Sequence, residues 1–157
     1  MHILSIKQFT YYIGLRSVDK YERVLMDKFS IPAFYMEDIA DKGMVNSVHE
    51  ALDVIDPSTS LPLHLSFDID CLDPLEAPST GTPVRGGVCL HHGVEVIEQL
   101  HRTGRLSAVN LVEVKTSIGD KCDVNLTLQA ADNLLQAVFG HLRRGNPPMD
   151  NKKLVKY

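Results

Sequence analysis

The sequence predicts an α/β protein built on a parallel sheet. Apolar runs alternate with segments of helical periodicity along most of the 157 residues, as in chains built from βα units. The clearest strand is the apolar run at 61–69. The loop at 72–87 that follows it is longer than the usual strand-to-helix connection, and such loops at strand ends are where α/β proteins place their chemistry. One domain without internal repeats is therefore expected.

Each expected element follows from a local pattern. Strands are predicted from short runs rich in β-branched, aromatic and aliphatic residues, at 10–15, 33–36, 61–69 and 108–114. Helices are predicted where apolar residues recur at intervals of three and four, at 19–29, 44–55, 93–101 and 126–142. Gly104 is placed to end the third helix, and 147–157 is expected to form an irregular tail.

The composition excludes several classes of function. A net charge of −4 and a pI near 5.9 provide no basic field for nucleic acid or anionic membranes, so a small cationic substrate suits the chain better. Its three cysteines have no CxxC spacing, which argues against a disulfide framework and a thiolate zinc site. With no targeting peptide and no apolar run of ~20 residues, a soluble cytoplasmic protein is expected.

Two aspartates at the end of the clearest strand are the first candidates for chemistry. In SFDIDCLDP, strand alternation would direct Asp68 and Asp70 to the same side, with α-carbons about 7 Å apart. Carboxylates at that spacing suit a hard divalent cation such as Mn²⁺, Mg²⁺ or Ca²⁺. The alternative is a polar strand end whose aspartates cap the next turn.

The longer motif resembles a known enzyme family. SFDIDCLDP followed by APSTGTPVRGG resembles a signature segment of the ureohydrolases, the family of arginase and agmatinase. TYYIGLRSVDKYE, LSAVNLVEVKTSIG and FGHLRRGN extend the resemblance over about 10–146. It implies a three-layer α/β/α fold, here without the N-terminal part of the sheet.

The resemblance also implies roles for individual residues. Asp68 would bridge two Mn²⁺ ions and Asp70 would bind one of them, and the hydroxide that they activate attacks the guanidinium carbon of L-arginine to give urea and ornithine. Glu113 would hold that guanidinium group. The alternative for Glu113 is a surface salt bridge.

Three further residues are implied in substrate binding. Asp19 and Glu22 match carboxylates that recognise the α-amino group, and Thr82 matches a threonine of the guanidinium pocket. The alternatives are a helix cap with its first-turn neighbour for the acidic pair, and a turn hydroxyl for Thr82.

Other residues with chemical potential receive no catalytic role. His64 is expected in the core or beside the metal ligands. His91 and His92 are assigned to the surface or a loop, and Cys71 to packing.

The chain departs from the family pattern in ways that weaken the metal site. Upstream GGDHS-like and DAHxD-like segments, which supply two histidines and two aspartates, do not occur, so an incomplete binuclear site is expected. Ser17 stands where arginases commonly have aspartate. Lys115 and Thr116 replace Asn-Pro, and the lysine is placed to pair with Glu113.

The sequence thus favours an arginase-like hydrolase of impaired activity, with agmatinase as the second ureohydrolase candidate. Asp19 and Glu22 favour arginase, because agmatinase substrates have no amino-acid end. The candidate from a different class is a non-catalytic truncated chain that associates with full-length subunits. Arginases are commonly trimers, and Arg143 matches an arginine of their interface.

Overall fold

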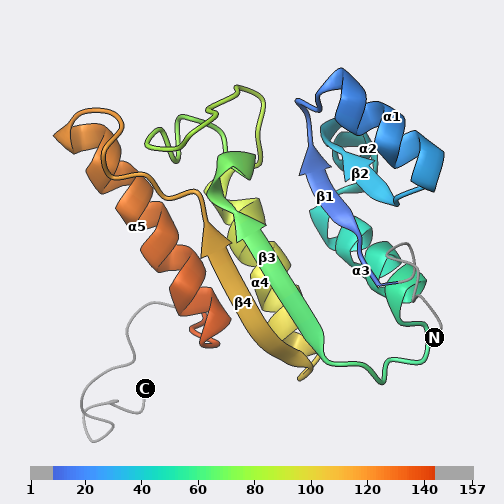
Figure 1. Ribbon diagram of the computed structural model, residues 1–157. Coiled ribbons are helices and arrows are strands. Elements are labelled where there is room, and N and C mark those ends of the chain that lie inside the picture. The colour runs from blue at the N-terminus through green and yellow to red at the C-terminus, as the bar shows by residue number, and fades with distance from the viewer. Residues whose placement is uncertain (1–8, 144–157) are drawn as a thin grey trace, which may run out of the picture.

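The computed structural model describes residues 9–143 and confirms the α/β fold class (Figure 1). The elements in order are β1 (Tyr12–Leu15), α1 (Lys20–Phe29), β2 (Ala33–Tyr35), α2 (Met36–Lys42), α3 (Met44–Ile55), β3 (Leu63–Asp68), a 3₁₀ turn (Ile69–Cys71), α4 (Leu90–Arg102), β4 (Leu106–Val112) and α5 (Lys121–Val138). The predicted tail at 147–157 lies outside the described residues.

All described strand pairs are parallel, as expected, but they form two small sheets instead of one. β1 pairs with β2, and β3 pairs with β4. The register of the second sheet runs from Leu63 opposite Leu106 to Asp68 opposite Val112. In Figure 1, β1 and β3 point the same way, but no hydrogen-bonded ladder joins them within the described residues. Each of these two strands therefore has one edge without a strand partner.

The hydrophobic core lies where helices α3, α4 and α5 pack against the strands. Buried residues of α3, α4 and α5 share one cluster with β3, including Val48, Ile97, Leu134 and Phe67. Gly93 lets α4 approach both neighbours, because a Cβ there would lie 3.1 Å from Phe67 Cζ and 3.3 Å from a methyl group of Leu134. Close packing around this glycine fixes the distance between α4, β3 and α5.

The opposite face of the β3–β4 sheet is open. Along β3, Leu63 and Phe67 are buried, whereas His64, Ser66 and Asp68 are exposed. Parallel sheets are normally covered on both faces. Over β3 the described residues thus place helices on one face, and the third of the three expected layers is not among them.

Element boundaries differ from expectation where side chains cap the backbone. α5 begins at Lys121 rather than 126 because Asp120 accepts hydrogen bonds from the N–H groups of Cys122 and Asp123. It ends near Gly140, whose φ of 79° is left-handed. α2 was not expected, since seven residues are too few to show a helical period. Gly104, also left-handed at φ 68°, follows the end of α4 as predicted.

Helix α1 lies at the surface of the protein. α1 has no buried residue, and its apolar side chains Val24 and Leu25 are exposed. Among residues 9–143, no helix is long and apolar enough to span a bilayer.

Asp56 fastens the start of β3 to the start of β4. Its carboxylate is buried and accepts hydrogen bonds from the N–H of Leu61, the hydroxyl of Ser58 and the guanidinium of Arg105. The backbone bond from Leu61, with the bond from Ser58 and the charge of Arg105, holds the pKa of Asp56 below its ordinary value of 3.8. Ionised Asp56 therefore stabilises the fold.

We predict that Asp56→Asn lowers stability at neutral pH and that its effect shrinks in acid. Because the folded pKa is depressed, the contribution of Asp56 is present above pH 3.8 and is lost as the pH falls through the lower folded value. Urea unfolding at pH 7 and pH 3 measures this. The prediction would be contradicted if wild type and variant differed as much in their free energy of unfolding at pH 3 as at pH 7.

Candidate functional site

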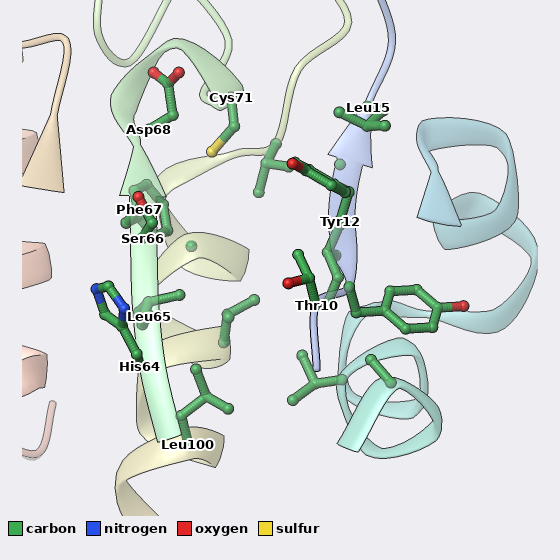
Figure 2. A pocket seen from close by; sticks show the side chains of 18 of the residues that line it. Thr10, Tyr12, Leu15, His64, Leu65, Ser66, Phe67, Asp68, Cys71 and Leu100 are labelled. Atoms are coloured by element: carbon green, nitrogen blue, oxygen red, sulfur yellow. The ribbon is translucent and has the colours of Figure 1, made fainter. Parts of the chain in front are cut away.

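A cleft of about 1180 Å³ separates β1 from β3. Its walls are the two strands, and its floor includes apolar residues of α3 and α4, among them Val48 and Val96. Figure 2 shows Tyr12 and Leu15 of β1, with Thr10 just before that strand, on one side and the β3 strand on the other. Five candidate residues line this one cleft: Asp19, Glu22, Asp68, Asp70 and Thr82. The structure thus brings together residues that are far apart in the sequence.

Asp68 and Asp70 lie at the carboxyl end of β3, but on different elements. The strand ends at Asp68, and Asp70 belongs to the 3₁₀ turn, so the strand alternation expected to direct both side chains to one side does not apply. The cause is that Asp68 Oδ1 accepts a hydrogen bond of 2.9 Å from the N–H of Asp70 and caps the turn. The capping alternative is therefore observed, and the two carboxylates remain neighbours.

The electrostatics of this pair suit a cation. Desolvation raises the pKa of Asp68, the N–H of Asp70 opposes that shift, and the negative charges of Asp70 and Glu113 raise the pKa further. Asp70 Oδ2 accepts a 3.2 Å hydrogen bond from the N–H of Thr82, whereas its buried Oδ1 has no hydrogen-bond partner. A buried carboxylate oxygen without a partner is costly, and a hard cation would satisfy it.

These two carboxylates form only part of a metal site. Within residues 9–143, no third histidine, cysteine, aspartate or glutamate joins Asp68 and Asp70 in a cluster of three ligand atoms. The residues present fit one side of a divalent cation and do not form a preformed binuclear centre.

Glu113 follows β4 beside the acidic pair. Its φ of 64° is in the left-handed region, which is uncommon for a residue with a side chain and costs backbone energy. Its Oε2 lies 2.9 Å from Lys115 Nζ. The predicted pairing of this lysine with Glu113 is thus present, and the hydrogen bond to Glu113, together with the negative charge of Glu113, raises the pKa of Lys115.

Asp19 and Glu22 form a capping box at the start of α1. Asp19 Oδ1 accepts from the N–H of Tyr21 at 2.8 Å, and Glu22 Oε2 accepts from the N–H of Asp19 at 3.1 Å. The structural alternative for these residues is therefore observed, and both also line the cleft.

Arg16 is a site residue that sequence reasoning missed. From the end of β1 its guanidinium donates hydrogen bonds across the cleft to the carbonyl groups of Asp70 at 2.7 Å, Val84 at 2.7 and 3.0 Å, and Cys71 and Leu72 at 3.3 Å. Backbone acceptors leave no trace in a sequence pattern, so no local signal could have identified them. Arg16 ties the first sheet to the acidic loop after β3.

Asp73 holds the same loop from the inside. Its Oδ1 accepts from the N–H of Leu75 and its Oδ2 from those of Gly86 and Gly87. The hydrogen bond from the N–H of Leu75 contributes most to lowering the pKa of Asp73, and those from Gly86 and Gly87 lower it further. A Cβ at Gly87 would lie 2.7 Å from backbone atoms of residues 71–73, so only glycine fits there.

The remaining candidates lie as follows. His64 is exposed on the open face of β3, which excludes the core alternative, and its position beside the metal ligands stays a prediction. Cys71 packs against the core, as expected, and burial raises the pKa of its thiol to about 12. His91 and His92 lie in the first turn of α4, and neither lines the cleft.

Comparison with known proteins gives a consistent result. The family model described as "Arginase family" matches residues 2–140. The arginase of Neurospora crassa is 45% identical over 141 residues, which is 88% of this chain and 38% of that protein. The mitochondrial arginase-2 of Homo sapiens is 38% identical over 135 residues, again 38% of its length. The chain thus spans less than half of these relatives.

Solved structures resemble the fold. The native arginase from Bacillus caldovelox aligns with a TM-score of 0.79 at 28% identity, covering 87% of this chain and 44% of that one. An arginase from Bacillus cereus gives 0.79 at 30% identity, covering 88% and 46%. A formimidoylglutamase from Bacillus subtilis, at 21% identity and a TM-score of 0.74, shares the fold alone.

We predict that Arg16→Ala and Arg16→Lys both loosen the loop after β3. Lysine keeps the charge but lacks the planar fork that reaches several carbonyl groups, so each variant should cost about 1–3 kcal/mol of local stability. Trypsin cleavage after exposed Arg85 measures the opening of the loop. Cleavage of Arg16→Lys at the wild-type rate would show that charge alone suffices and contradict the assignment.

Proposed function

Because the chain belongs to the arginase family, we propose that it carries one part of the active site of an Mn²⁺-dependent hydrolase that converts L-arginine to urea and ornithine. The observation that carries this proposal is the convergence of Asp19, Glu22, Asp68, Asp70 and Thr82 on one cleft. Carboxylates concentrated at a strand end suit both a divalent cation and a cationic substrate.

In this proposal Asp68 and Asp70 are metal ligands. Asp70 offers the buried Oδ1 that lacks a partner, and Asp68 offers an exposed carboxylate beside it. Bound Mn²⁺ would supply a water of lowered pKa, which is a nucleophile near neutral pH. Capping of the turn by Asp68 holds its carboxylate in place at the strand end.

Glu113 is proposed to bind the substrate guanidinium. A planar guanidinium can make paired hydrogen bonds to a carboxylate, which a lysine ammonium cannot. The Lys115 ammonium that now contacts Glu113 would have to leave before substrate binds, so Lys115 is expected to weaken binding. Thr82 lines the cleft, whereas Glu113 lies outside its lining, and the N–H of Thr82 already holds Asp70 in place.

Asp19 and Glu22 are proposed to recognise the α-amino group of the substrate. They lie at the start of α1, which directly follows the β1 wall of the cleft. Their capping bonds fix the positions of both carboxylates. Acidic groups at this place match the amino group of a cationic substrate, and the likeness to arginases favours L-arginine over agmatine as that substrate.

A second candidate function is association with longer subunits of the same family, without catalysis by this chain alone. The observation that favours it is the pair of open strand edges along the cleft, combined with the open face of β3. One extended segment from another polypeptide could pair with both edges and cover the apolar floor of α3 and α4. Such a segment could also bring further metal ligands, and the trimeric assembly expected from the resemblance belongs to this proposal.

We predict that the isolated chain binds Mn²⁺ weakly and forms no measurable urea from L-arginine. Two carboxylates are a small part of the ligand set that a binuclear centre needs. Isothermal titration with Mn²⁺ and a urea assay test this together. Asp68→Asn should remove the residual Mn²⁺ binding, while Asp19→Ala, its matched control, should leave that binding unchanged. Tight binding of two Mn²⁺ ions with urea release would show that the chain is a complete enzyme, and equal effects of both substitutions would refute the metal assignment.

A further inference from the structure

A second group of metal-ligand side chains lies at the start of α4, outside the cleft. Ligand atoms of His91, His92 and Glu95 all lie within 4.8 Å of one another. Within residues 9–143, no other three such groups lie so near to one another. His91 and Glu95 are four residues apart and face each other on the helix, and the His92 ring lies 5.4 Å from the His91 ring.

We propose that this His-His-Glu cluster binds one borderline divalent cation, of the Zn²⁺, Ni²⁺ or Cu²⁺ class. Two imidazole nitrogens and a carboxylate oxygen are the donor set that these ions favour, whereas Mn²⁺ prefers oxygen. Donor atoms about 2.0 Å from one tetrahedral ion lie roughly 3.3 Å apart. To bind such an ion, the three side chains must rotate closer together than their present separations of up to 4.8 Å.

A neighbouring cysteine positions one ligand. Cys89 is the residue that precedes α4, and its Sγ lies 3.3 Å from His92 Nδ1. A partner on one ring nitrogen fixes the orientation of an imidazole and leaves the other nitrogen for the metal. Cys89 is not in the cluster of three, so its role is to orient His92 rather than to bind the ion.

The contact of Arg143 with His91 competes with metal binding and thereby provides a test. Its Nη1 lies 2.7 Å from His91 Nδ1, while Nε and Nη2 contact the two carboxylate oxygens of Glu98 at 3.2 Å. If the metal takes Nδ1 of His91, it displaces the arginine. If the metal takes Nε2, then Nδ1 carries the proton and cannot accept from Arg143. In both cases the contact between Arg143 and His91 must break, so metal binding and this contact exclude each other.

The experiment is isothermal titration of the full chain with Zn²⁺, with Mn²⁺ as the comparison ion. Wild type is expected to bind one Zn²⁺, and His91→Ala, His92→Ala and Glu95→Gln should each weaken binding at least about tenfold. His49→Ala is the matched control, because His49 is an exposed helical histidine with Asp53 four residues later and no second histidine beside it. Asp68→Asn should also leave Zn²⁺ binding unchanged, which separates this cluster from the cleft.

Arg143→Ala should tighten Zn²⁺ binding several-fold, an effect that loss of general structure would not produce. The proposal is overturned if Arg143→Ala weakens binding or leaves it unchanged. It is also overturned if His49→Ala lowers the affinity as much as His92→Ala, since the ion would then bind any surface histidine. Unchanged affinity in Glu95→Gln would likewise contradict a three-ligand site.

Discussion

Backbone pairing along the strands is the constraint on which the rest of this structure depends. An inner strand of a parallel sheet satisfies its N–H and C=O groups on both edges, yet β1 and β3 each have a strand partner on one edge only within the described residues. The cleft between them is therefore bounded by hydrogen-bonding groups as well as by side chains. Its floor is apolar. The cleft therefore resembles both the space that a further strand would occupy in a sheet and a cavity that binds a ligand.

The acidic end of the cleft follows from the same arrangement. The carboxyl ends of parallel strands lie at one edge of a sheet, so Asp68 at the end of β3 and Glu113 after β4 become neighbours. Arg16 is the cationic group that reaches this end from β1, and it is engaged with carbonyl oxygens. Asp70 therefore retains a buried oxygen without a partner, and desolvation, with the negative charges nearby, raises the pKa of Asp68. This local excess of negative charge is what a bound cation or a cationic substrate would neutralise.

Patterns within one element predicted most of the fold. The spacing of apolar residues gave the bounds of α3 correctly, and the apolar run of β3 was located to within two residues. Interactions between elements were not predictable in this way. The hydrogen bonds of Arg16 go to backbone carbonyls far along the chain, and the separation of β1 from β3 depends on which strands pair. For the site, motif resemblance identified the acidic residues, but the turn that Asp68 caps and that contains Asp70 required the structure.

Hydrogen exchange of individual backbone amides along β1 and β3 tests the central claim that these strands have open edges in the isolated chain. In a parallel strand, successive residues direct their amides to opposite edges, so protection is expected to alternate. Amides of β3 that bond to β4 should exchange slowly, and those that point into the cleft should exchange rapidly. Uniform slow exchange along both strands would show that the cleft is already filled or closed, and would contradict this account.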